Sequence, residues 1–440
     1  MQTSWLPNRK KVRLVLKNTV KKRGMMMQGR KGTRKWKALA STALSLLMLV
    51  TGCGGTTESS SQPGTNQQPS EAPAEETVKI GLILSATGTF APLTESIRNG
   101  FELYLEEHDR KLGGRKVEVK FEDDEANPQV ALRKYRQLVT GEKVNLLVGP
   151  ISSAVAYALR DEVEKDKMIL IDANAAGNDL SWKMKSDYIY RLSFSNWQNG
   201  SSAAAYLAQN VGKTAIAIAP DYPAGIEVVA GFKGAFEAGG GQVVKEIYPK
   251  LGTNDFATYM TEIAQLKPDL VFTFMTGSDG IRFVKQYSDF GLKGQIPLAG
   301  PSEFGDQLII EPTGDATEGI IAGIMYSPWL ENEANRKFVE SYQKKYNKLP
   351  NMFSVQGYDS AQVIDKAIAK AGGVKSEDLV NVLKGISFDS PRGPITIDPK
   401  TNNPIQNFYV VKNTKKEQGI VPEVLQTVEK VTMPDTDPAQ

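Results

Sequence analysis

From Val78 onward the sequence alternates short apolar, β-branched runs with longer amphipathic stretches, and this alternation limits the fold more than any other feature. The runs predicted as strands are 78–84, 116–122, 145–149, 168–172, 188–192, 215–219, 243–248, 270–275 and 320–325. The stretches predicted as helices are 92–110, 127–140, 154–166, 199–210, 224–238, 256–267, 279–290, 333–346, 355–371 and 376–385. Apolar strands that alternate with amphipathic helices indicate parallel sheets covered on both faces. The sequence therefore predicts an α/β fold, in which the alternation runs twice with a break near 192–200.

A basic segment and a short apolar run precede this body. Basic residues up to Lys37 lead into the apolar run 38–50, whose thirteen residues are fewer than the about 20 needed to span a bilayer. We therefore interpret 1–53 as a signal peptide that ends at Cys53, the only cysteine of the chain. Residues 54–77 are rich in Gly, Ser, Pro, Gln and Glu and lack large apolar side chains, which predicts a disordered tether.

Charge and composition exclude several classes of protein. The thirteen Lys and Arg of residues 1–53 leave 40 basic against 50 acidic residues in the rest, so the remainder is mildly acidic and unsuited to nucleic acid. One histidine and one cysteine cannot build a multi-histidine zinc site or a Cys/His pair, and we expect no metal and no cofactor. The sequence contains no G-x-S-x-G, Walker A or G-x-G-x-x-G pattern, which disfavours an enzyme.

Three turns that follow predicted strands are candidates for ligand contacts, because ligands of parallel sheets bind beyond the carboxyl ends of the strands. The first is residues 85–89, after strand 78–84. Ser152 and Ser153 follow strand 145–149 and begin a helix, where hydroxyls and free N–H groups suit a carboxylate. The alternative is that either serine is only a helix cap. Residues 172–178 form a turn of small residues that lets a ligand approach the backbone.

An ordered set of segments resembles the type I periplasmic solute-binding proteins of ABC importers, in particular the leucine/isoleucine/valine-binding family. The set includes VKIGLILSATGTFAP, GGRKVEVKFEDDEANPQVA, VNLLVGPISSAVA and DYPAGIEVVAGFKGAFEAGGGQVV. The resemblance implies two Rossmann-like lobes with parallel sheets, joined by three crossovers near 195, 325 and 395–406. Lobe one would comprise 78–195 plus 326–394, and lobe two 196–325 plus 407–430. The run Val50-Thr51-Gly52-Cys53 resembles the lipobox of bacterial lipoproteins, which implies lipid attachment at Cys53.

The same resemblance implies particular binding residues. Ser153, with Ser152 beside it, would hold a ligand carboxylate, and the carbonyl of Ala173 would receive an ammonium group. Ala175 stands where the family has a hydroxyl. Tyr222 matches an aromatic residue of lobe two, and Phe353 matches a contact to the ligand side chain.

The acid expected to pair with a ligand ammonium has two candidates. Direct alignment puts Ser302 there, so Glu303 requires a shift of one residue, and Asp279 at a helix start is the other. The run that contains Trp197 is more similar to relatives that take aromatic or other organic acids, and Trp197 would then stack on the ligand or only pack the hinge.

The expected function is capture of a small carboxylate-bearing ligand by lobe closure, for an ABC permease, on the outer face of the cell membrane. We expect a branched-chain or other amino acid on family frequency, with an aromatic or other organic acid as the alternative. A sensor that signals to a receptor is a second alternative, because nothing in the sequence separates it from an importer component.

Overall fold

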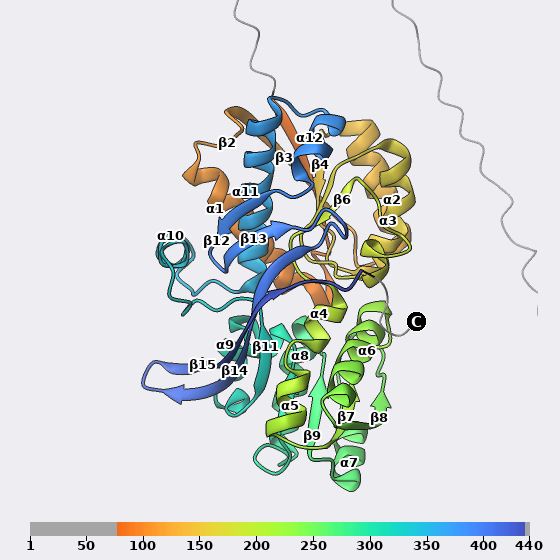
Figure 1. Ribbon diagram of the computed structural model, residues 1–440, viewed down its shortest axis with the longest axis vertical. Coiled ribbons are helices and arrows are strands. Elements are labelled where there is room, and N and C mark those ends of the chain that lie inside the picture. Colours follow the sequence, from red (N-terminus) through yellow and green to blue (C-terminus); the bar gives the residue numbers. More distant parts are fainter. Residues whose placement is uncertain (1–76, 436–440) are drawn as a thin grey trace, which may run out of the picture. The chain divides into compact units, whose positions relative to one another are not determined.

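Residues 77–435 are described by the computed structural model, and they contain two β-sheets with helices on their faces (Figure 1). The predicted signal peptide, Cys53 and nearly all of the predicted tether lie outside the described residues. Within 77–435, no helix has both the length and the apolar character needed to cross a bilayer.

The first sheet has the strand order β2-β3-β1-β4-β5-β6. Its strands are β1 (Val78–Leu84), β2 (Lys111–Leu112), β3 (Arg115–Asp123), β4 (Leu146–Val148), β5 (Leu170–Asp172) and β6 (Ile189–Arg191). All neighbours are parallel except the β2–β3 hairpin. Side chains alternate between the two faces as a strand requires: Ile80 and Leu82 join the core under α1 (Ala91–Glu107) and α11 (Met352–Ala371), whereas Ile83 joins the core under α2 (Pro128–Arg136) and α3 (Ser153–Asp166).

The second sheet has the order β12-β13-β14-β11-β10-β9-β7-β8, and β15 pairs with β14. Its strands are β7 (Thr214–Ile218), β8 (Gln242–Ile247), β9 (Leu270–Thr273), β10 (Leu298–Gly300), β11 (Ile321–Ile324), β12 (Ser387–Ser390), β13 (Gly393–Ile397), β14 (Pro404–Lys416) and β15 (Gly419–Val431). Ile216 and Ile218 of β7 face α7 (Ala257–Leu266) and α8 (Gly277–Asp289), whereas Ala215 and Ala217 face α5 (Ala204–Asn210) and α6 (Pro223–Ala238). The remaining α-helices are α4 (Asn196–Ser201), α9 (Gln307–Thr313), α10 (Glu333–Tyr346) and α12 (Ser376–Leu383).

The chain contributes to each core in separate segments. The buried cluster around the first sheet takes side chains from 78–194 and again from 325–408, and we call this body lobe one. The two clusters around the second sheet take side chains from 203–324 and from Val410 and Val411, and we call this body lobe two. The two-lobe α/β architecture predicted from the sequence is therefore present.

The strands differ from the sequence prediction at the C-terminus. The second sheet is mixed, because β14 is antiparallel to β11, β13 and β15. Strands β10 and β12 to β15 were not among the predicted runs. β10 has only three residues, and polar residues and Pro422 interrupt the apolar residues of β14 and β15, so no long apolar run marks these strands. The predicted helix 199–210 is two helices, α4 and α5, with a break at Ser202 and Ala203.

Candidate ligand-binding site

A narrow cavity lies where elements of both lobes meet. The free volume inside it is about 20 Å³, so side chains of the two lobes nearly fill the space between them. Its lining comes from the loops and helix starts that follow strands of both sheets. The lining residues are Phe90, Leu93, Ile151, Ser153, Asn174, Ala176, Phe194, Asn196, Tyr222, Ala224, Phe274, Thr276 and Glu303.

Ser153 lies at one polar end of this cavity. It is the first residue of α3 and is buried, and its Oγ accepts a hydrogen bond from Asn196 Nδ2 at 3.3 Å. The N–H groups of the first turn of α3 have no partner within the helix, so an anion beside Ser153 would meet both the hydroxyl and the positive end of the helix dipole. Ser152 is the residue before the helix; it makes no capping hydrogen bond and does not line the cavity. Of the two serines, only Ser153 borders the ligand space.

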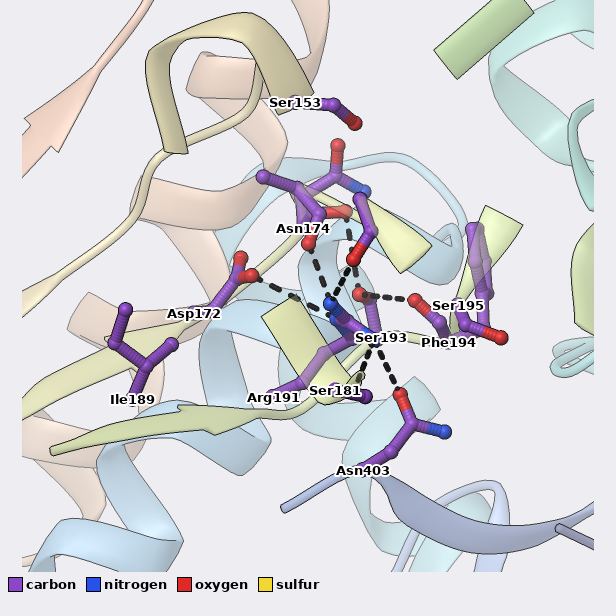
Figure 2. Close-up of polar contacts among 12 residues, drawn as sticks. Ser153, Asp172, Asn174, Ser181, Ile189, Arg191, Ser193, Phe194, Ser195 and Asn403 are labelled. Carbon is purple, nitrogen blue, oxygen red and sulfur yellow. Dashed lines mark hydrogen bonds and ion pairs between the residues drawn. The ribbon is translucent and has the colours of Figure 1, made fainter. Parts of the chain in front are cut away.

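The turn that follows β5 is held by hydrogen bonds from the buried side chain of Arg191 (Figure 2). Arg191 donates hydrogen bonds to the carbonyls of Ala175 at 3.2 Å and Gly177 at 2.6 Å, and to Asn403 Oδ1 at 2.7 Å. Its Nε lies 3.7 Å from the Asp172 carboxylate. Burial raises the pKa of Asp172, and the positive charge of Arg191 opposes that rise. The guanidinium therefore fixes the loop and connects it to Asn403, directly before β14.

This anchoring decides which residues of the turn reach the cavity. Asn174 and Ala176 line it, whereas Ala173 and Ala175 are buried and do not. The carbonyl of Ala175 is already occupied by Arg191. The carbonyl of Asn174 accepts a hydrogen bond from Ser193 Oγ at 3.2 Å.

Glu303 is the carboxylate that lines the cavity. It follows β10 in a short 3-10 turn, Ser302–Gly305, and is only 4% exposed. Asn199 Nδ2 donates to its Oε2 at 3.3 Å, and its own backbone N–H also donates to the carboxyl group. Burial raises the pKa of Glu303 to about 7, and the hydrogen bonds from its own backbone N–H and from Asn199 oppose that rise only partly. Ser302 does not border the cavity, and its Oγ donates to the carbonyl of Gly323 at 3.1 Å.

The other acid candidate, Asp279, already has hydrogen-bond and ion-pair partners. It accepts from the backbone N–H of Gly252 at 2.7 Å, forms an ion pair with Arg282 of its own helix, and accepts from Thr89 Oγ1 at 3.3 Å. Asp279 is buried and does not line the cavity, although Thr276 at the start of α8 does.

Of the three predicted aromatic contacts, Tyr222, Phe353 and Trp197, only Tyr222 borders the cavity. Tyr222, immediately before α6, lines the cavity, and its ring centroid lies 6.3 Å from that of Phe90. Phe353 is buried in the core of lobe one and does not line the cavity. Trp197 points elsewhere: it is partly exposed, it is absent from the lining, and its backbone N–H donates to Asn178.

Several lining residues were not among the predicted site residues. They are Phe90, Leu93, Ile151, Asn174, Ala176, Phe194, Asn196, Ala224, Phe274 and Thr276. Phe274 and Thr276 directly follow β9, so the rule that places ligands beyond strand ends would have found them. Asn196 belongs to α4 at the first crossover, where the sequence has no periodic pattern that would mark it.

These observations define a two-lobed α/β protein with a polar and aromatic cavity between its lobes, which is the architecture of a small-molecule binding protein. Residues 77–418 match the family model described as periplasmic binding protein, and the chain belongs to this family.

Named relatives agree with this assignment. The chain is 32% identical over 350 residues to the Leu/Ile/Val-binding protein homolog 6 of Brucella melitensis, covering 78% of this chain and 89% of the relative. It is similar to the solute-binding protein of an ABC transporter from Rhodopseudomonas palustris in complex with benzoate, at 35% identity and a TM-score of 0.76, covering 80% of this chain and 98% of the other. A second solute-binding protein, from Rhodopseudomonas palustris BisB5 in complex with 3,4-dihydroxybenzoic acid, matches at 32% identity and a TM-score of 0.78, covering 81% and 99%.

Proposed function

We propose that this protein captures a small aromatic carboxylate for an ABC importer. The observation that carries the proposal is the lining of the cavity. Ser153 at the start of α3 offers a seat for a carboxylate, and four aromatic side chains, Phe90, Phe194, Tyr222 and Phe274, surround the remaining space. Aromatic rings pack favourably against each other in offset or edge-to-face arrangements, so such walls suit an aromatic ligand.

The ligands bound by similar proteins also favour this class. The similar proteins from Rhodopseudomonas palustris have benzoate and 3,4-dihydroxybenzoic acid bound. The proposal therefore departs from the expectation of an amino acid that family frequency suggested.

Glu303 suggests that the ligand carries a hydrogen-bond donor. Its carboxyl group borders the cavity and accepts hydrogen bonds from Asn199 and from its own backbone N–H. A carboxylate has room for further hydrogen bonds, so a ring hydroxyl that donates to Glu303 would bind better than a bare ring. We propose hydroxybenzoates as the preferred members of the class.

An amino acid is the second candidate, and Glu303 is also the observation that favours it, because its carboxylate could pair with an ammonium group. The rest of an ammonium site has weaker support: Ala175 supplies no hydroxyl and its carbonyl is bonded to Arg191, and Asp279 is paired with Arg282.

A thermal-shift and calorimetry screen separates the two. We would test benzoate, 4-hydroxybenzoate, 3,4-dihydroxybenzoate, L-leucine and L-phenylalanine. A ligand at 100 times its dissociation constant adds about 2.7 kcal/mol of stability. We expect the aromatic acids to stabilise the protein, with both hydroxybenzoates ahead of benzoate. Stabilisation by an amino acid without any response to aromatic acids would overturn the proposal.

The cellular setting is also a proposal. We propose that Cys53 carries a lipid that anchors the protein to the outer face of the cell membrane, and that the loaded protein delivers its ligand to ABC permease subunits without transforming it. A sensor that signals to a receptor stays an alternative. Genes for a permease and an ATPase beside this one would support the importer.

A further inference from the structure

Glu227 lies in the second turn of α6, a helix of lobe two, and it contacts the opposite lobe. Its Oε2 accepts hydrogen bonds from the backbone N–H of Asn178 at 2.7 Å and from Asn196 Nδ2 at 3.0 Å. Its Oε1 accepts a hydrogen bond from the hydroxyl of Tyr157 in α3. One carboxylate thus gathers three donors, two from lobe one and one from the crossover helix α4.

The partners of Glu227 are themselves held in position. The Tyr157 hydroxyl also accepts from the backbone N–H of Asp179 at 3.3 Å. The ring of Tyr157 lies against Gly177, where a Cβ would come within 2.6 Å of the ring, so only glycine allows this approach. Asn178 in addition accepts from the backbone N–H of Trp197 at 2.8 Å, which joins the same loop to α4.

Other carboxylates that bridge the lobes differ from Glu227 in one respect. Asp279 is paired with Arg282 of its own helix, and Asp306 accepts from Leu308 of its own helix as well as from Met352 of lobe one. Both keep partners if the lobes separate. Glu227 accepts no hydrogen bond from lobe two among the described residues, so its hydrogen bonds to Tyr157 and Asn178 exist only while the lobes are together.

Glu227 is also connected to the ligand space. Asn196, which donates to Glu227, donates from the same amide nitrogen to Ser153 Oγ at 3.3 Å, and both Asn196 and Ser153 line the cavity. Glu227 itself does not line it. The carboxylate can therefore act on ligand binding only through lobe closure and through the orientation of Asn196.

We propose that Glu227 is a closure latch: a positioning residue whose carboxylate holds the lobes together through Tyr157 and Asn178 and aligns Asn196 with the anion seat at Ser153. The latch acts for any ligand held at Ser153. A ligand that binds the closed form gains affinity in proportion to how much the latch favours that form.

The test compares Glu227→Gln and Tyr157→Phe with the control Glu237→Gln, an exposed acid on the same helix. The full chain carries Cys53→Ser and spin labels at cysteines introduced at the exposed positions Asp161 in α3 and Gln265 in α7. Inter-lobe distances are measured first without ligand, so the result does not depend on which ligand is right. We expect Glu227→Gln to shift the distribution to longer distances and Glu237→Gln to leave it unchanged.

Calorimetry and stopped-flow dissociation with 4-hydroxybenzoate as the probe complete the test. We expect Glu227→Gln to weaken binding about 10- to 100-fold and Tyr157→Phe less, mainly through faster dissociation. The ligand-free melting temperature should change little. Unchanged inter-lobe distances in Glu227→Gln would overturn the latch. A lowered ligand-free melting temperature with full affinity for the probe would also overturn it, because that result indicates a structural role only. Failure of the probe to bind at all would count against the proposed ligand class, while the ligand-free distances would still decide the latch.

Discussion

Replacing Ser153 with alanine should weaken binding of any carboxylate ligand. The substitution removes one hydroxyl from a buried position at the start of α3 and leaves the helix dipole and the first-turn N–H groups intact. A hydrogen bond to a charged group contributes about 1.5–3 kcal/mol, so we expect the dissociation constant to rise about 10- to 150-fold. The remaining helix terminus should preserve part of the affinity, because its N–H groups still face the anion.

Ser152 provides the matched control. It is adjacent and equally buried, but it lies outside the cavity lining and its side chain makes no capping hydrogen bond. Ser152→Ala should therefore change the affinity less than about threefold, since neither a ligand contact nor a cap is lost.

Isothermal titration calorimetry of the two variants with 4-hydroxybenzoate, beside thermal melts without ligand, gives the answer. A melting temperature lowered equally in both, with affinity retained, would mean that the serines serve only the fold. Full affinity in Ser153→Ala, or a loss confined to Ser152→Ala, would refute the anion seat at Ser153.

Three further outcomes follow from the structure. Burial raises the pKa of Glu303 from 4.5 to about 7, so its native carboxyl keeps a proton that the unfolded chain releases, and the free energy of unfolding should fall as pH rises from about 4.5 to 7. In urea titrations of the ligand-free protein, Glu303→Gln should remove about 2–3 kcal/mol of that fall. Equal pH slopes in both proteins would contradict the raised pKa. In calorimetry with 4-hydroxybenzoate, Tyr222→Ala should weaken binding at least tenfold and Trp197→Ala less than about threefold, because only Tyr222 borders the cavity. The reverse order would show that the ligand ring lies against Trp197. Cys53→Ser should move the protein from the membrane to the soluble fraction on cell fractionation, and membrane association of the serine variant would exclude a lipid anchor at this residue.

Local patterns were sufficient for the elements that carry most of the fold. Strand 78–84 and helix 333–346 were predicted with the bounds that the structure has, because each combines a clear apolar period with caps or flanking polar residues. The C-terminal hairpin β14–β15 was missed because polar residues and Pro422 interrupt its apolar residues. Its backbone pairing follows from the position of β11, which no local pattern encodes.

The candidate site was predictable where it follows a strand and unpredictable where it depends on distant contacts. Ser153 could be found because it stands at a strand-to-helix turn. Arg191 gave no signal, since its role depends on Asn403, 212 residues away in the chain. Glu227 stands in the apolar helix PAGIEVVAGF, where one acid suggests an exposed position, and its partner Tyr157 is 70 residues away.

Recognition and closure share one short helix, which limits how they can be separated by mutation. Asn196 and Asn199 are three residues apart on α4 and therefore lie on the same face, about 4.5 Å apart along the axis. Asn196 contacts Ser153 and Glu227, and Asn199 contacts Glu303, so the helix at the first crossover organises both polar ends of the cavity. Changes in either asparagine would alter the ligand contacts and the hinge together. Ser153 and Tyr157 are better probes, because Ser153 borders the cavity without contacting Glu227, whereas Tyr157 contacts Glu227 without bordering the cavity.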